Sequence, residues 1–164
     1  MTADTSIIGM VTSRSRVVIE RGPVANFASA LDDESPVYKD PAAAGAAGLA
    51  GIPAPPTFPF CMEHWGRFAE IQPEDQPDAN PIADIIGSLM SSGGLILHGE
   101  QSFTYRRPIV VGDVLVGEGK VVDVYEKESS KGTKMTFIVS ETSWTDERTG
   151  EPVVSTRFNL IHRA

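Results

Sequence analysis

Apolar and polar residues alternate along the second half of the chain, and this pattern predicts long strands. Met135, Phe137 and Val139 fall on one strand face, and a second alternating set repeats near the end of the chain: Val154, Thr156, Phe158 and Leu160. Four strands are predicted, over residues 95–105, 113–127, 131–145 and 152–162. Short loops such as Thr149-Gly150 join them, so the sheet is expected to be antiparallel.

The first half of the chain has a different pattern, with ten of the twelve prolines within residues 1–94. Residues 16–19 predict a first strand that Gly22-Pro23 ends. A helix is predicted over residues 23–31, and a short helix begins at Pro41 with Asp40 as its N-cap. The first half of the chain is therefore predicted to contain both helices and a strand.

The most apolar helical pattern covers residues 57–71. Phe58, Cys61, Trp65 and Phe68 recur at a spacing of three or four, which predicts a fully buried central helix. Residues 72–80 are polar and rich in proline, as in a surface loop, and residues 82–91 predict only a weak helical turn.

This order of elements predicts an α+β fold of the hot-dog type. An antiparallel sheet of about five strands is expected to wrap around the central helix, which covers one face of the sheet. A length of 164 residues suits one domain, so residues 1–164 are assigned to a single hot-dog domain.

Composition and charge exclude several classes of function. Fourteen basic and twenty-two acidic residues give a net charge of −8, which argues against a nucleic-acid partner. No apolar run suits a membrane span, and the first residues lack the features of a secretory signal. Cys61 is the single cysteine, so a disulfide within the chain and a multi-cysteine zinc site are excluded. A cytoplasmic location is expected.

Local motifs for catalysis or metal binding are not found, and no metal is expected. The three histidines, His64, His98 and His162, lie far apart in sequence and are expected to be ordinary surface or hydrogen-bonded residues. Cys61 lies on the apolar helix face, as an inert core thiol does. Arg106 and Arg107 precede Pro108 at a strand end, where they form a surface pair or contact a phosphate. The acidic cluster 32–34 has two interpretations, a solvated loop that caps the helix beginning near Pro41 or a functional site.

The segment 27–41 bears on both interpretations, and its sequence is Phe-Ala-Ser-Ala-Leu-Asp-Asp-Glu-Ser-Pro-Val-Tyr-Lys-Asp-Pro. It resembles the MaoC-like dehydratase family, which includes the R-specific enoyl-CoA hydratases and whose signature is Gly-Asp-x-Asn-Pro-Ile/Leu-His-x-Asp-Pro. Asp33 occupies the position of the catalytic aspartate, and Tyr38 replaces the catalytic histidine. Asp32 and Ser35 also depart from the signature, whereas the remaining motif positions match: Pro36, Val37, Asp40 and Pro41.

The resemblance extends over nearly the whole chain. Residues 51–58, Gly-Ile-Pro-Ala-Pro-Pro-Thr-Phe, are similar to the family segment before the central helix. Residues 105–115 are similar to a strand-turn-strand segment of the family. The chain is most similar to the N-terminal hot-dog half of two-domain members, in which that half often lacks the catalytic pair.

The resemblance implies a non-catalytic role. In active members, Asp and His activate water for addition to an enoyl thioester, and a tyrosine with a pKa of about 10 is a poor base at neutral pH. The chain is therefore expected to be the non-catalytic subunit of a heteromeric enoyl-CoA hydratase or 3-hydroxyacyl-thioester dehydratase. A separate MaoC-like subunit in a heterodimer or heterotetramer would supply Asp and His, and no cofactor is implied.

Three alternatives stay open. The first is a self-sufficient hydratase homodimer that uses Asp33 with Tyr38 or a histidine from elsewhere. The others are a thioesterase, for which Glu63 is the candidate carboxylate, and a module that binds acyl thioesters of coenzyme A or acyl carrier protein. In the region 73–94, five apolar residues either line an acyl tunnel or pack on the sheet: Ile82, Ile85, Ile86, Leu89 and Met90.

Overall fold

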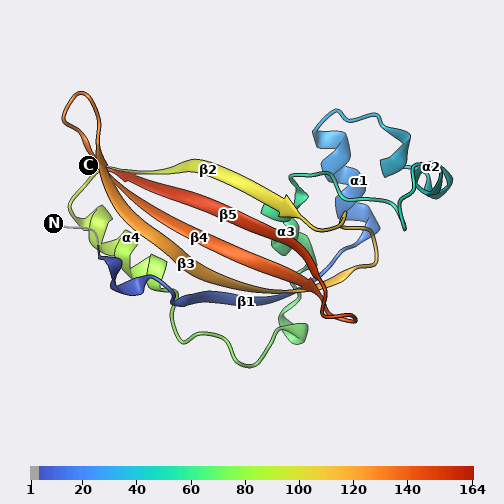
Figure 1. The fold of residues 1–164 in the computed structure, drawn as a ribbon, viewed down its shortest axis with the longest axis horizontal. Helices are drawn as coiled ribbons and strands as arrows, with labels where there is room; N and C mark the ends of the chain where they lie inside the picture. Colours follow the sequence, from blue (N-terminus) through green and yellow to red (C-terminus); the bar gives the residue numbers. More distant parts are fainter. Residues whose placement is uncertain (1–3) are drawn as a thin grey trace.

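The computed structural model describes residues 4–164, and its main feature is one long antiparallel sheet (Figure 1). The strands are β1 (Val11–Val18), β2 (Leu95–Tyr105), β3 (Val114–Glu128), β4 (Lys134–Asp146) and β5 (Pro152–Arg163). They lie in the order β1-β3-β4-β5-β2, and every neighbouring pair is antiparallel. The predicted antiparallel sheet of five strands is confirmed, although β1 begins at Val11 rather than at residue 16.

Four helices lie at the two ends of this sheet. They are α1 (Arg21–Ala30), α2 (Pro41–Ala46), α3 (Met62–Gly66) and α4 (Pro81–Ser91). Figure 1 shows α1, α2 and α3 at one end and α4 at the other. Asp40 accepts a hydrogen bond from the backbone N–H of Ala42 (2.8 Å), which confirms the predicted N-cap of α2. None of the described helices has the length and apolar character needed to cross a membrane.

The predicted central helix over residues 57–71 is wrong. A 3₁₀ turn (Phe58–Phe60) leads into α3, which ends at Gly66 because the next residue, Arg67, is extended with φ −94° and ψ 92°. Gly66 lies directly against β1, where a Cβ atom would be 2.3 Å from the carbonyl oxygen of Val18. Phe58 is buried as predicted, but Trp65 and Phe68 at the end of the segment are 42% and 37% exposed. The spacing of apolar residues along 57–71 gives no indication that the backbone of Gly66 contacts the backbone of Val18.

The region predicted as a weak turn instead forms α4, a helix of eleven residues. Asn80 caps it by accepting a hydrogen bond from the backbone N–H of Ile82 (3.0 Å), and Pro81 occupies the first helical position. Three apolar residues of the region contact a core cluster on the sheet: Ile82, Ile85 and Leu89. This helix therefore covers the end of the sheet that α3 does not reach.

The strand register assigns each residue to one of two sheet faces, and the inner face is the one that α3 and α4 cover. A cross-strand row on this face joins Ser15, Gly117, Trp144, Val154 and Tyr105. The next row toward α4, which we call the hydroxyl row, joins Ser13, Gly119, Thr142, Thr156 and Phe103. The hydroxyl row lies between the core cluster that includes Trp144 and the separate cluster beneath α4. The inner face is therefore apolar at its ends and polar in its middle.

The outer face carries the predicted alternating set of β4. Phe137 stacks on Tyr125 with ring centroids 4.7 Å apart, and the Lys127 ammonium lies 5.2 Å from the Tyr125 ring centroid. Val154, Phe158 and the other members of the β5 set lie on the inner face, as the register requires.

The edge of the sheet at β1 is covered by the segment 66–75. The side-chain amide of Gln72 donates to the carbonyl oxygen of Arg16 (2.8 Å) and accepts from the N–H of the same residue (3.0 Å). Arg14 also donates to the carbonyl oxygen of Asp75 (2.7 Å). The two Gln72 bonds pair backbone groups of Arg16 that a strand edge leaves free, and the Arg14 bond holds the segment in place.

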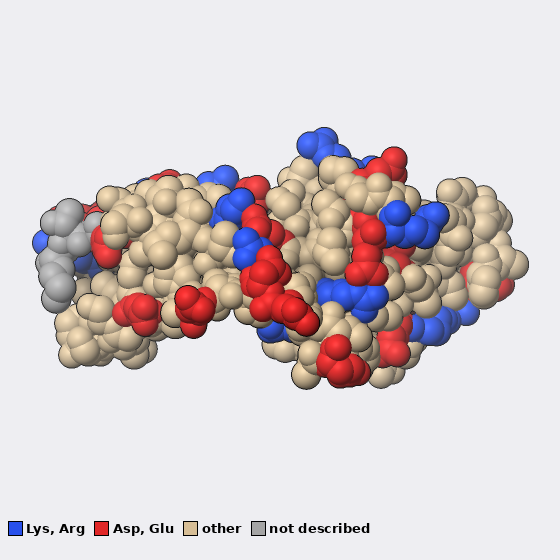
Figure 2. Space-filling model, turned by 90° about the horizontal axis from the view of Figure 1, so that it is seen from below, with Lys and Arg blue, Asp and Glu red and all other residues tan. Residues whose placement is uncertain are grey.

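Ion pairs reinforce the same edge on the outer side of β1. Arg14 pairs with Glu118 (3.0 Å) and Arg16 pairs with Glu147 (2.6 Å). Figure 2, in which the molecule is seen from below, shows basic side chains beside acidic ones across the middle of this face. Several acidic side chains on this edge are therefore paired with arginines, although the chain as a whole has a net charge of −8.

Candidate functional site

The loop after α1 holds Asp33 in a fixed position. Asp32 adopts the left-handed conformation (φ 55°), which turns the chain away from the helix. The carboxylate of Asp33 then accepts a hydrogen bond from the backbone N–H of Ser35 (3.0 Å). The interpretation of this cluster as the cap of the helix at Pro41 is wrong for Asp33, because Asp40 caps that helix. Asp33 instead orders its own loop.

Tyr38 is brought close to Asp33 by a short 3₁₀ turn (Pro36–Tyr38). The Arg21 guanidinium fixes this turn by donating to the carbonyl oxygens of Tyr38 (2.8 Å) and Lys39 (3.0 Å). Burial, and then the negative charge of Asp33, raise the pKa of Tyr38 above its ordinary value of 10.0. The phenol therefore stays protonated at neutral pH, where it is a hydrogen-bond donor and a poor base.

A second tyrosine, Tyr105, belongs to the same site and was missed by sequence reasoning. Its hydroxyl donates to the carbonyl oxygen of Pro56 (2.8 Å), and burial followed by the proximity of Tyr38 raises its pKa. Tyr105 begins the similar segment 105–115, but only the fold places it beside residue 38. The site thus contains one carboxylate and two protonated phenols.

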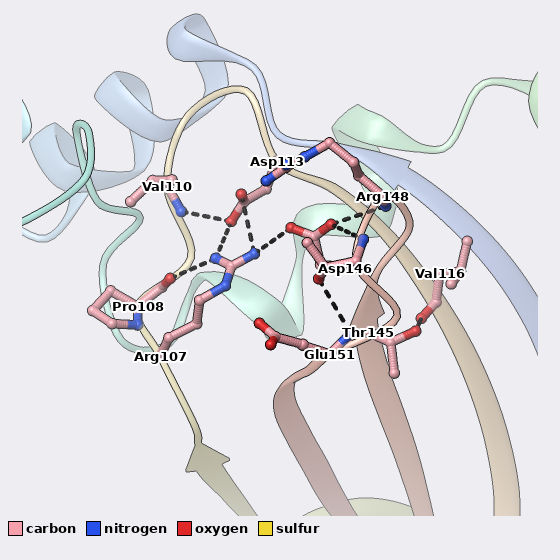
Figure 3. Close-up of polar contacts among 10 residues, drawn as sticks. Arg107, Pro108, Val110, Asp113, Val116, Thr145, Asp146, Arg148 and Glu151 are labelled. Atoms are coloured by element: carbon pink, nitrogen blue, oxygen red, sulfur yellow. Dashed lines mark hydrogen bonds and ion pairs between the residues drawn. The ribbon is translucent and has the colours of Figure 1, made fainter.

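Arg107 forms a second polar cluster at the turns between strands (Figure 3). Its guanidinium donates to both carboxylate oxygens of Asp113 (2.6 and 3.2 Å) and to Asp146 (2.7 Å). Asp113 also accepts from the backbone N–H of Val110 (3.0 Å). Arg107 therefore joins two loops through Asp113, Asp146 and the Pro108 carbonyl oxygen, which favours a structural role over contact with a phosphate.

We expect Asp146→Asn to flatten the acid side of the stability profile. Hydrogen bonds from the backbone N–H of Thr149 first, then the N–H of Arg148 and the Arg107 guanidinium, lower the pKa of Asp146 from 3.8. A lowered native pKa gives stability that is present above about pH 4 and is lost as the pH falls through the native value. Urea unfolding between about pH 7 and about pH 3 measures this loss.

Asp78→Asn serves as the control for that measurement. Asp78 is exposed and forms no hydrogen bond or ion pair within the described residues, so its variant should keep the parental pH dependence. The free energies of unfolding of Asp146→Asn and the parent should therefore differ by an amount that changes with pH. A difference that stays constant across the pH range would contradict the lowered pKa of Asp146.

The histidines occupy three unrelated environments. His162 is buried with its Nε2 atom 2.8 Å from the carbonyl oxygen of Gly93, whereas His64 is exposed. The His98 ring lies on the inner face between Phe60 (5.4 Å) and Phe158 (4.6 Å). Residues 4–164 contain no group of three His, Cys, Asp or Glu side chains placed to hold a metal ion.

Cys61 directly precedes α3 and Glu63 lies in its first turn, and the two side chains differ in exposure. The Cys61 thiol is buried and donates to the carbonyl oxygen of Phe58 (3.3 Å), and burial raises its pKa, which keeps it protonated. The exposed Glu63 accepts a hydrogen bond from the buried Ser15 hydroxyl (2.5 Å). The nearest partner of Glu63 is therefore a hydroxyl on the sheet.

The candidate tunnel residues of α4 divide into two groups. Ile85 and Leu89 pack on the sheet and also line a cavity of about 490 Å³ together with Ile7 and Met10. Ile82 packs on the sheet, Ile86 is half-buried, and Met90 is 43% exposed. The sheet contacts and the cavity lining therefore coexist on one helix.

Comparisons with known proteins agree with this fold. Residues 6–156 match the family model described as the FAS1-like dehydratase domain region. A UPF0336 protein of Thermobifida fusca (strain YX) is 32% identical over 145 residues, which are 88% of this chain and 83% of that protein.

Two solved structures share the fold at lower identity. One belongs to the ChsH1-ChsH2 complex from Mycobacterium tuberculosis, with a TM-score of 0.72 and 24% identity over 93% of this chain and 83% of that chain. The other belongs to the C-terminally truncated HadBC complex, a 3R-hydroxyacyl-ACP dehydratase from the same organism. It gives a TM-score of 0.67 and 20% identity over 96% of this chain and 98% of that chain.

Fold and matches together define the class of the protein, a hot-dog protein of the MaoC-like dehydratase type. The chain belongs to the family of the FAS1-like dehydratase domain region. The resemblance to the MaoC-like dehydratase family is thereby confirmed.

Proposed function

We propose that this chain is the non-catalytic subunit of a heteromeric enoyl-CoA hydratase or 3-hydroxyacyl-thioester dehydratase. A partner hot-dog subunit supplies the Asp/His pair, and this chain contributes to the acyl-binding tunnel. The observation that carries the proposal is the protonated Tyr38 phenol beside Asp33, at the position of the family histidine.

Water addition to an enoyl thioester needs a group that takes and returns a proton near neutral pH. Histidine does so, whereas the raised pKa of Tyr38 leaves only a hydrogen-bond donor. Loss of one general acid–base group typically lowers the rate by a factor of about 10²–10⁴. The loop that contains Asp33 and Tyr38 therefore lacks a group that can serve as the general base near neutral pH.

The two sheet edges differ in a way that supports a partner at β2. Gln72 and Arg14 cover β1, whereas β2 pairs with β5 on one side and with no described strand on the other. Leu95 and Leu97 on β2 are 59% and 41% exposed. An open edge with apolar side chains favours addition of a strand from another subunit.

The acyl group has a matching place at the other end of the sheet. Ile85 and Leu89 line the cavity of about 490 Å³ beneath α4, whose size suits a small-molecule tail. We therefore include Ile85 and Leu89 in the proposed acyl-binding tunnel.

Hydration of crotonyl-CoA tests the proposed function directly. The purified chain is assayed alone, and again after mixing with a hot-dog subunit that carries an intact Asp-x-Asn-Pro-x-His motif. Robust turnover by the chain alone would contradict the proposal and favour the self-sufficient homodimer.

A Leu97→Lys variant tests the position of the partner. We expect it to weaken the heteromer about tenfold or more, because it places a charge at the apolar end of the open edge. Sedimentation or light scattering of the mixed subunits measures the change. Ile8→Lys is the matched control, since Ile8 is 43% exposed on a different part of the surface. Equal effects of both substitutions would argue against β2.

A further inference from the structure

The outer face of the sheet carries an apolar cross-strand row, which we call the outer row. It runs over four strands and consists of Leu97, Ile161, Phe137 and Tyr125. Leu97 is 41% exposed and the other three side chains are half-buried. Among residues 4–164, the helices that cover the sheet, α3 and α4, pack on the opposite face. An apolar patch left uncovered in this way typically marks an interaction surface.

Charged residues flank the outer row, and the two signs lie on opposite sides of it. The neighbouring row toward the loop between β3 and β4 contains the cations Lys127 and Arg163. The neighbouring row on the other side contains the carboxylates Asp123 and Glu100. The outer face is therefore basic on one side of a narrow apolar band and acidic on the other.

Most of these charges are not used within the chain. Among residues 4–164, the side chains of Lys127, Arg163 and Asp123 form no ion pair and no hydrogen bond, and all three are at least partly exposed. By contrast, Arg14 and Arg16, which lie on the same face near the β1 edge, are each paired with a glutamate. The charges beside the outer row are therefore available to another molecule.

A second copy of the chain matches this pattern. Two sheets pack face to face about 10 Å apart with their strands nearly aligned. A twofold axis along the outer row brings the outer rows of both copies together and keeps each strand opposite its own counterpart. Lys127 on β3 then lies opposite Asp123 of the second copy. Arg163 on β5 lies opposite Asn159 of the second copy and beside Glu100, which accepts a hydrogen bond from that asparagine (3.3 Å).

This pattern favours a second copy over a partner of uniform charge. A uniformly acidic or basic surface would be attracted by one side of the outer row and repelled by the other. A second copy is complementary on both sides, because the twofold axis exchanges the basic and the acidic side. The charges therefore select both the occupant and its orientation.

We propose that the outer row and its charged flanks form an interface between two copies of this chain related by a twofold axis. The apolar side chains form its centre, and the two symmetric pairs of Lys127 with Asp123 fix the orientation. The backbone edge of β2 stays free for another subunit. That the contact joins two heteromeric pairs into a heterotetramer rests on the function proposed above, whereas the contact itself needs neither partner nor thioester.

Complementary charge reversals test this interface with the purified chain. Lys127→Glu and Asp123→Lys each place like charges at both symmetric contacts, so each should raise the Kd for self-association about tenfold or more. An equimolar mixture of the two variants has opposite charges at both contacts of a mixed dimer. Its Kd should therefore return to nearly the parental value. Sedimentation equilibrium over a range of concentrations measures the parent, both variants and the mixture.

The matched control variants are Lys131→Glu and Asp78→Lys. They carry the same changes of charge in exposed loops outside the sheet, and should keep the parental Kd, alone and mixed. A parent chain that stays monomeric, an association that the reversals do not weaken, or a mixture that does not recover would each overturn the proposal. Hydration of crotonyl-CoA with the partner subunit is measured separately, so none of these results decides the proposed function.

Discussion

In the proposed heteromeric hydratase, Asp33→Asn is expected to leave kcat nearly unchanged, whereas loss of the histidine from the motif of the proposed partner should lower kcat by a factor of about 10²–10⁴. The difference follows from the geometry of Asp33, which accepts the N–H of Ser35 within its own loop and has a protonated phenol beside it. Crotonyl-CoA hydration by the two mixed complexes at saturating substrate measures both effects. A large loss of kcat with Asp33→Asn, in a complex that still assembles, would assign chemistry to this chain.

Tyr38→His provides the complementary control. It places an imidazole where the resemblance to the family signature puts the catalytic histidine, but Asp32 and Ser35 still depart from that signature and shape the loop around Asp33. We therefore expect little or no hydration by the folded variant alone. A gain that also requires Asp33 would identify the loop as a decayed active site whose geometry survives.

Gly66→Ala is expected to destabilise the chain by about 1–3 kcal/mol or more, as overpacking of a tight contact does. The added Cβ would lie 2.3 Å from the Val18 carbonyl oxygen and 2.7 Å from a Val17 methyl group, and the backbone oxygen has little room to move. Urea unfolding at neutral pH measures the loss as a lower midpoint.

Gly87→Ala is the matched control for this substitution. Gly87 lies within α4 and has nothing within 4 Å of an added Cβ, so alanine should stabilise the helix by up to about 1 kcal/mol. Equal stability of Gly66→Ala and the parent would mean that α3 can move away from β1.

The strands could be predicted because their signal is local. Alternation along β4 and β5 and the turn at Thr149-Gly150 determine which residues share a face. The helices were harder, because the end of α3 depends on a backbone contact between Gly66 and Val18, which are far apart in sequence. The α4 helix was underestimated, although Asn80 and Pro81 carry a recognisable cap signal.

In the candidate site too, some residues could be predicted from a local motif and others only from the fold. Asp33 and Tyr38 could be found from one short motif, and the structure brings them together. Tyr105 comes from the distant end of β2, and the hydroxyl row requires residues from all five strands in register. No pattern in a single segment indicates such a set, because cross-strand neighbours are defined only once the sheet has formed.

The unequal edges of the sheet also limit how far an assembly can grow. A sheet that accepts strands at both edges can extend without end, as in a fibril, and must be stopped by other means. Here Gln72 closes β1 by pairing both backbone groups of Arg16, so growth in the plane of the sheet is possible only at β2. Once β2 is paired with a partner whose other edge is closed in the same way, the joint sheet has no free end. Termination is thus favoured by the chain's own segment 66–75, which lies against β1 through Gly66, Gln72 and Asp75.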